Sequence, residues 1–70
     1  MQKETKYLNE NQVSEIIGMS VQTLRNWRFQ GKGIPYVKAG RSVRYQYQDV
    51  IEYMEERKIL THKLKQPKIN

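Results

Sequence analysis

The chain has 70 residues, a net charge of +6 and a sequence pI of about 9.8, so it has room for one small core and little for a substrate cleft. It has no cysteine, which excludes disulfides and thiolate metal sites, and no apolar run near the roughly 20 residues that a membrane helix requires. Because the sequence also shows no paired catalytic carboxylates, phosphate loop or signal-peptide core, we expect a cytoplasmic protein that is not an enzyme, needs no cofactor or metal and does not enter a membrane.

The basic residues are segregated along the chain. Between Ile16 and Gln48 there are six basic residues and no acidic one, and a second acid-free stretch begins at Arg57. Such segregation is typical of a surface that faces a polyanion, because neutralised phosphates release condensed counterions. We interpret it as a nucleic-acid-binding surface. A surface facing anionic lipid, or a charge that only keeps the protein soluble, is the alternative.

The first helix is predicted between Asn9 and Gly18, after a flexible segment formed by residues 1–6. Asn9 can cap this helix while Gln12 reaches back in a capping box, and Gly18 ends it. A hydrophobic staple precedes the buried stripe, so apolar contacts are expected from Leu8, Val13, Ile16 and Ile17.

A second helix is predicted between Ser20, whose hydroxyl can cap it, and Gly31, which can adopt the left-handed conformation that ends a helix. Leu24 and Trp27 face the core. We expect the aliphatic stem of Arg28 to be buried beside them and its guanidinium head to reach a phosphate or the β-hairpin (wing) that is predicted after this helix. Two short helices joined by a turn of about three residues that contains glycine predict a helix-turn-helix. A helical hairpin made only for packing is the alternative, but it needs no acid-free second helix followed by a basic loop.

A two-stranded hairpin, or wing, is predicted after Pro35, which prevents the helix from continuing. The β-prone segments 36–38 and 42–45 flank a turn at Gly40. Because side chains alternate across a strand, one face of the second segment is apolar and the other polar. A hairpin alone is marginally stable, so this one must pack against the helices.

The third helix starts after Gln46, a weak cap, and has Asp49 in its first turn, where a carboxylate suits the helix dipole. Its apolar stripe consists of Val50, Tyr53 and Met54, with Ile51 widening it. Its outer face is acidic and should point away from nucleic acid. We expect fraying near residues 58–60, a domain over residues 7–59, and a basic flexible tail over residues 60–70.

Five short segments follow one another in a defined order: Thr23–Arg28, Gly31–Gly33, Pro35, Lys38–Tyr45 and Asp49–Val50. Together they resemble the small winged-helix proteins of the excisionase and AlpA-type group, whose DNA-binding module is similar to that of MerR regulators. Each segment is weakly specific, but the ordered set is strong. The resemblance covers about Tyr7 to Arg57.

The resemblance implies a mainly α fold with a small β-hairpin, a winged helix-turn-helix in the order helix, turn, helix, strand, strand, helix. It implies that the second helix enters the major groove of double-stranded DNA and that the wing meets the backbone or minor groove. Members act as recombination directionality factors of phages and other mobile elements, or as small transcriptional regulators. The dimerising helix and effector domain of full MerR regulators are absent, so no small-molecule effector is expected.

Two sets of residues are predicted to contact DNA. Polar and basic side chains on the second helix can read base edges or grip phosphate, and those of the wing can bind phosphate. A solvated helix face and simple solubility are the alternatives for the two sets. The predicted contacts are Ser20, Val21, Gln22, Thr23, Arg25, Asn26 and Arg28 on the helix, and Lys38, Arg41, Ser42 and Arg44 on the wing.

Other functions are also considered. Tyr36 and Tyr45 could stack on single-stranded bases, although packing under the wing is favoured for both. Phe29 departs from the polar residue common in the group. We expect it to cover the wing, and contact with a thymine methyl or with a partner protein is the alternative. One domain of this size buries too little surface for tight specific binding, so we expect either an integrase or recombinase partner or further copies bound cooperatively. An interaction protein from a mobile element is a further alternative. His62 has no His, Cys or carboxylate at the spacing of metal ligands, so we assign it no function.

Overall fold

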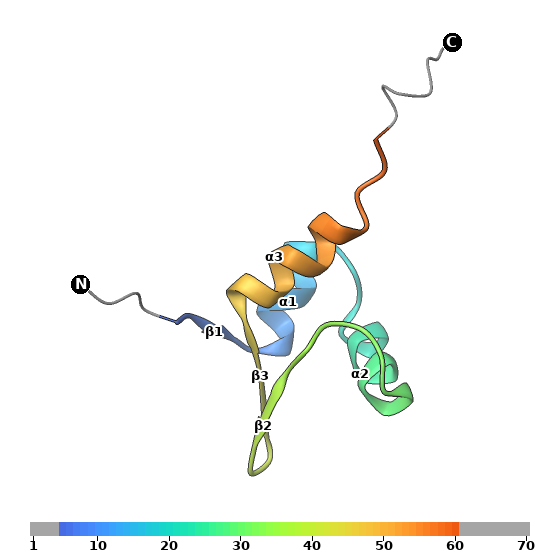
Figure 1. Cartoon of the computed structure of the whole chain (residues 1–70). Coiled ribbons are helices and arrows are strands. Elements are labelled where there is room, and N and C mark those ends of the chain that lie inside the picture. Colours follow the sequence, from blue (N-terminus) through green and yellow to red (C-terminus); the bar gives the residue numbers. More distant parts are fainter. Residues whose placement is uncertain (1–4, 61–70) are drawn as a thin grey trace, which may run out of the picture.

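Three helices and a small antiparallel sheet make up residues 5–60, the part of the chain that the computed structural model describes (Figure 1). Each element is short, and two of the three strands lie next to a helix in the sequence. In chain order the elements are β1 (Tyr7–Leu8), α1 (Glu10–Ile17), α2 (Val21–Gln30), β2 (Val37–Ala39), β3 (Ser42–Gln46) and α3 (Tyr47–Glu56).

The starts of α1 and α2 follow the predicted capping chemistry. The Asn9 side chain accepts from the Gln12 amide at 2.8 Å, and the Gln12 side chain accepts from the Asn9 amide at 2.8 Å, which completes the capping box. Ser20 accepts from the Thr23 amide at 3.1 Å. Gly18, in the left-handed conformation at φ 71°, ends α1. Gly18 and Ser20 therefore end α1 and begin α2 on either side of a tight turn, as the sequence predicts.

The predicted order of elements is incomplete, because a short strand precedes α1. In this strand, β1, Tyr7 pairs with Gln46 and Leu8 with Tyr45, so β1 adds to β3 on the side away from β2. The Lys6 carbonyl accepts from the Tyr47 amide at 2.9 Å and satisfies the start of α3, where Gln46 makes no side-chain cap. A strand of two residues is too short to show a periodic pattern in the sequence, so β1 is recognised only from its pairing with β3.

The β2–β3 hairpin confirms the predicted strand pair, with the first strand beginning one residue later than expected. Val37 pairs with Arg44 and Ala39 with Ser42, and the turn passes through Gly40 at φ 63°. The second strand continues directly into α3 (Figure 1). The hairpin is therefore anchored at its base by β1 on one side and by α3 at its end.

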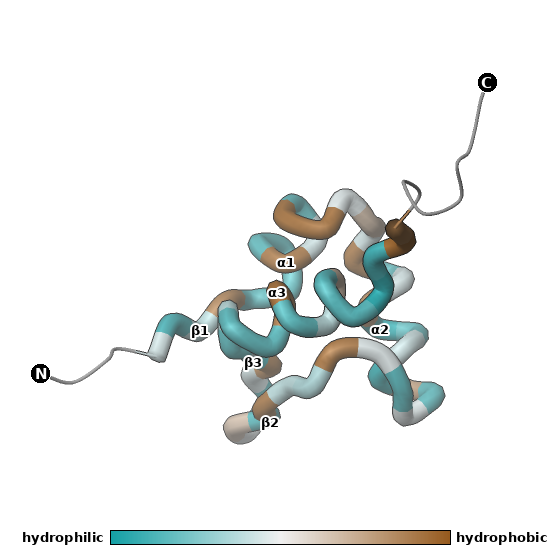
Figure 2. Tube along the Cα trace, turned by 45° about the horizontal axis from the view of Figure 1, so that its top comes forward, coloured by the Kyte–Doolittle hydropathy of each residue, from teal (hydrophilic) through white to brown (hydrophobic). Residues whose placement is uncertain are grey.

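The core lies where α1, α2, β3 and α3 meet. Tyr45 is 1% exposed and belongs to it, which agrees with packing rather than base stacking for this ring. The prediction is wrong for two residues of the apolar stripes, because Ile16 and Met54 are exposed. Figure 2 shows that most of α3 is hydrophilic. The buried residues are Leu8, Val13, Leu24, Ile34, Tyr45 and Val50.

The connection from α2 to β2 closes over the core at Gly33. This glycine has φ 94°, and a Cβ placed on it would lie 2.8 Å from two carbon atoms of the Trp27 side chain. Trp27 in turn stacks against Tyr53 of α3, with ring centroids 5.7 Å apart. The predicted end segments, residues 1–6 and 60–70 with His62, lie outside the described residues except for positions 5, 6 and 60.

Candidate nucleic-acid interface

The face of α2 opposite the core is polar and exposed. Leu24 is buried and Trp27 half-buried on the inner side, whereas Gln22, Arg25 and Asn26 are exposed on the outer side. Gln22 Nε2 donates to Asn26 Oδ1 at 3.0 Å, one helical turn on. This pair of amides places hydrogen-bond donors and acceptors side by side at the surface, and base edges are read by such groups.

Other predicted contacts at the start of α2 have structural roles of their own. Ser20 caps the helix, and its hydroxyl lies 3.0 Å from the hydroxyl of Thr23. Both Thr23 and Val21 are half-buried. Contact of these three residues with DNA stays a prediction.

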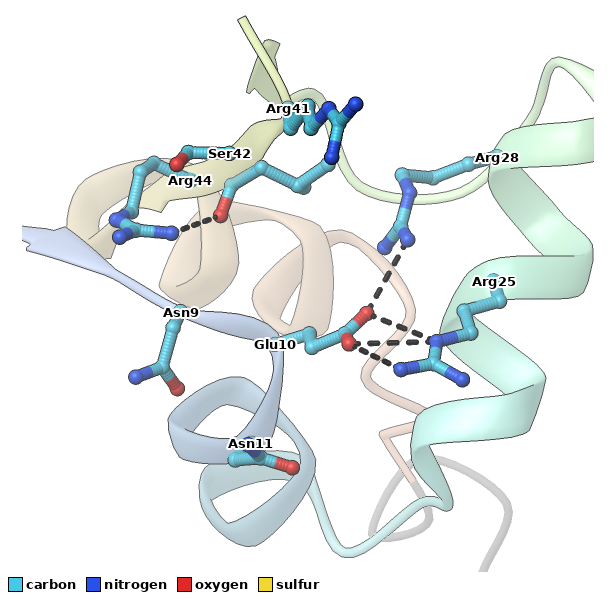
Figure 3. Close-up of a pocket in the computed structure, with 9 residues that line it drawn as sticks. Asn9, Glu10, Asn11, Arg25, Arg28, Arg41, Ser42 and Arg44 are labelled. Atoms are coloured by element: carbon cyan, nitrogen blue, oxygen red, sulfur yellow. Dashed lines mark hydrogen bonds and ion pairs between the residues drawn. The ribbon is translucent and has the colours of Figure 1, made fainter. Parts of the chain in front are cut away.

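An open pocket of about 490 Å³ lies between the start of α1, the middle of α2 and β3 (Figure 3). Four guanidinium groups and one carboxylate border it, so the pocket is strongly basic. The lining brings together five predicted contacts from α2 and the hairpin, which are Arg25, Arg28, Arg41, Ser42 and Arg44. The remaining lining residues are Asn9, Glu10, Asn11 and Val43.

Glu10 links the first helix to two arginines of α2. Its carboxylate accepts from Arg25 Nη2 at 2.7 Å and from Arg28 Nη2 at 3.1 Å (Figure 3). The hydrogen bonds from Arg25 lower the pKa of Glu10; burial opposes this shift, and the bond from Arg28 adds to it. The same pairing raises the pKa of Arg25. All three groups are therefore charged at neutral pH.

Arg28 connects α2 to the hairpin. Its Nη1 donates to the Tyr45 hydroxyl at 2.6 Å, and its guanidinium carbon lies 5.7 Å from the centre of the Tyr36 ring. Burial disfavours its charge, but the bonds to Tyr45 and Glu10 outweigh that effect and raise its pKa. The prediction that its head reaches the wing is confirmed. With its side chain only 17% exposed, Arg28 supports the pocket wall, and its contact with DNA stays a prediction.

The hairpin divides its predicted contacts between two faces. Lys38 is opposite Val43 in the register, whereas Ser42 and Arg44 alternate onto the other face. Of the four predicted contacts, Ser42, Arg44 and the turn residue Arg41 line the pocket. Lys38 is exposed but lies apart from that lining, so the structure does not gather all four residues at one place.

A scan against protein-family models matches residues 7–58 to a family described as a helix-turn-helix domain. The chain belongs to this helix-turn-helix family. Searches of curated proteins and of solved structures find no match. Membership in this family indicates DNA binding.

Two features of this helix-turn-helix domain were missed or mistaken at the level of sequence. Glu10 was not predicted as part of the interface, because its partners lie 15 and 18 residues away and no local pattern signals them. The prediction that Phe29 covers the wing is wrong: it is 93% exposed. Phe29 lies seven residues after Gln22, on the same exposed face of α2.

Residues 5–60 contain neither a candidate membrane span nor a candidate metal site. No helix there has the length and apolar character needed to cross a membrane. That part of the chain also has no group of three or more His, Cys, Asp or Glu residues placed to hold a metal ion.

Proposed function

We propose that the protein is a sequence-specific double-stranded DNA-binding protein of excisionase type, a recombination directionality factor of a phage or other mobile element. In this proposal α2 is the recognition helix, which lies in the major groove. The observation that carries the proposal is the convergence of Arg25, Arg28, Arg41 and Arg44 on one pocket beside the polar face of α2. Base-edge readers and phosphate-binding groups then lie on one continuous surface. That combination is what specific duplex recognition requires.

Each part of the surface has a role in this proposal. Gln22 and Asn26 present paired amides to adenine in the major groove, and Arg25 presents its guanidinium to guanine. Arg41 and Arg44 of the hairpin bind the phosphates that flank the groove. The phosphate contacts position the domain on the duplex, and the amides and Arg25 select the sequence.

The biological role rests on the resemblance to excisionases. A domain of this size buries about 600–1,000 Å² on DNA, so further copies on neighbouring sites or a recombinase strengthen its binding. Their cooperative assembly bends or organises the DNA for excision. A small AlpA-like regulator would use the same surface to exclude polymerase. In either role we expect a cytoplasmic protein that is not an enzyme and takes no small-molecule effector.

A single-stranded ligand is less well supported. Tyr45 is buried and holds Arg28 through its hydroxyl, so its ring has no face available for a base. Tyr36 is 42% exposed, but its ring lies 6.1 Å from that of Tyr45 and beneath the Arg28 guanidinium. The two tyrosines therefore pack the base of the hairpin, as favoured from sequence.

The proposal is tested by selecting bound duplexes from a random library at about 150 mM salt. Affinities are then measured for the selected duplex, an unrelated duplex and the separated strands. We expect the selected duplex to bind at least about a thousandfold more tightly than the unrelated one. Equal affinity for all four ligands would contradict specific duplex binding.

The excisionase role has its own test in an excision assay. The DNA contains the selected site between the attachment sites of an integrating element, and the reaction contains that element's recombinase. We expect excision only when the protein is added. Repression of a promoter that carries the site, with no effect on excision, would favour the regulator instead.

A further inference from the structure

Glu10 is an acid in the middle of a basic surface. The stretch from Ile16 to Gln48 has no acidic residue. The fold nevertheless places the Glu10 carboxylate of α1 in the lining of the pocket that four arginines border, here called the arginine pocket. Its side chain is only 20% exposed, and it lies among the guanidinium groups (Figure 3). A carboxylate on a DNA-facing surface repels phosphate, so its place there calls for a function.

The carboxylate bonds to one edge of Arg25 and leaves the other edge open. Arg25 Nε lies 3.3 Å from both oxygens of Glu10, and Nη2 donates at 2.7 Å. Within residues 5–60 no acceptor bonds to Nη1 of Arg25. A guanidinium reads guanine with two N–H groups directed at O6 and N7. With its Nε side taken by Glu10, Arg25 can direct the Nη1–Nη2 end at such a pair of acceptors.

The carboxylate is itself held in place. Its Oε1 accepts from Arg28, and Arg28 bonds to the buried Tyr45 of β3. A chain of contacts therefore runs from the core through Arg28 and Glu10 to Arg25, which is 55% exposed. A long exposed arginine loses rotamer freedom when it binds, and a partner that restrains it beforehand reduces that loss.

We propose that Glu10 is a specificity-determining positioning residue, which orients Arg25 toward a guanine edge and weakens its attraction for phosphate. The inference rests on the proposed DNA-binding function. A carboxylate next to Arg25 repels a fully charged phosphate more strongly than the neutral acceptor edge of a base. Both effects favour the specific complex over non-specific binding, because non-specific binding depends on phosphate contacts.

The test compares Glu10→Gln with Glu15→Gln. Both variants remove one negative charge from α1, but Glu15 is exposed and does not line the pocket. For Glu10→Gln we expect about threefold to tenfold tighter binding of an unrelated duplex and unchanged or weaker binding of the selected duplex. The ratio of the two affinities then falls by at least about threefold. For Glu15→Gln we expect that ratio to stay within about twofold of the wild type.

The affinity ratio separates positioning from a purely structural role. If Glu10 only stabilised the fold, its loss would weaken both complexes equally and leave the ratio unchanged at temperatures well below the unfolding transition. In an Arg25→Ala background, Glu10→Gln should no longer alter the ratio, because the group that it orients is absent.

The outcomes also separate this inference from the proposed function. A wild type that prefers no duplex would overturn both. A wild type that prefers its selected duplex, together with Glu10→Gln and Glu15→Gln variants of equal ratio, would overturn the role of Glu10 and leave specific DNA binding intact.

Discussion

The protein has two charged faces that are constructed differently. In the arginine pocket, Glu10 of α1 pairs with Arg25 and Arg28 of α2, and Arg28 continues to Tyr45 of β3. On α3 the acidic residues take partners from their own helix or the residues just after it. These pairs are Gln48 with Glu52 at 3.2 Å, Glu55 with Lys58 at 2.8 Å, and Glu56 with Arg57 at 3.5 Å.

This difference in the range of the contacts shows that the tertiary fold fixes the side chains of the arginine pocket but not those of the α3 face. Pairs three or four residues apart form in any helix and contribute little at an exposed surface. Pairs between elements exist only when the domain is folded, and they fix their side chains at defined places. We therefore interpret the pocket as a recognition surface and the α3 face as a solvated one that is directed away from DNA.

The largest expected effect separates the two faces by stability. Arg28→Ala leaves the buried Tyr45 hydroxyl without its donor and removes one of the two arginines that bond to Glu10, so the free energy of unfolding should fall by about 2–3 kcal/mol. Arg57→Ala removes a guanidinium that lies 3.5 Å from the Tyr53 ring centre on α3, and should lower it by less than about 1 kcal/mol. Urea unfolding of both variants measures the difference. Equal losses would mean that the connections between elements add nothing.

A smaller effect is expected in DNA affinity. Arg25→Ala should weaken binding of the selected duplex by about 1–2 kcal/mol, a factor of roughly 5 to 30, and should relax the preference at one base pair. Glu52→Gln on the acidic face should change the affinity by less than about twofold. Fluorescence anisotropy with the selected duplex and its single-base variants gives both values. A uniform loss for Arg25→Ala over all sequences would assign this residue to phosphate rather than to a base.

The hairpin should affect the salt dependence of binding. Arg41→Ala removes one expected phosphate contact, so the slope of log K against log salt should become shallower by about 1, with little change in sequence preference. The control is Lys6→Ala, which lies outside the pocket and outside both acid-free stretches and should leave the slope unchanged. An unchanged slope for Arg41→Ala would remove the hairpin tip from the interface.

The smallest effect concerns acid stability. Because the fold lowers the pKa of Glu10 below its ordinary value near 4.5, its paired form stabilises the protein above that pH. This contribution is lost as the pH falls through the lowered pKa. The difference in Tm between wild type and Glu10→Gln should therefore be largest near neutral pH and should shrink below about pH 4.5. A difference that stays constant with pH would contradict a stabilising ion pair.

The success of sequence reasoning followed the distance over which each interaction acts. The capping box at Asn9 and the left-handed glycine at Gly18 depend on residues within one turn, and both were predicted. The buried positions of Val13 and Leu24 followed from helical periodicity. Local chemistry therefore accounts for the two helices of the helix-turn-helix and for the turn between them.

Features that depend on distant partners were not accessible in the same way. β1 exists because Tyr7 and Leu8 meet β3 almost forty residues later, and Glu10 enters the pocket only because α1 packs beside α2. Phe29 was expected to cover the wing, but it is 93% exposed, because the way the hairpin packs on α2 is set by contacts between distant residues. The sequence predicted a basic surface on the second helix and the hairpin, but that Arg25, Arg28, Arg41 and Arg44 line one pocket became visible only in the fold.

The central claim is that the recognition helix and the hairpin, and not the α3 face, bind duplex DNA. The most direct measurement is a titration of the ¹⁵N-labelled protein with its selected duplex, followed through backbone amide chemical shifts. We predict the largest shifts at residues 20–29 and 40–44, with small shifts at residues 49–56. Shifts concentrated on α3, or spread evenly over the domain, would contradict this account.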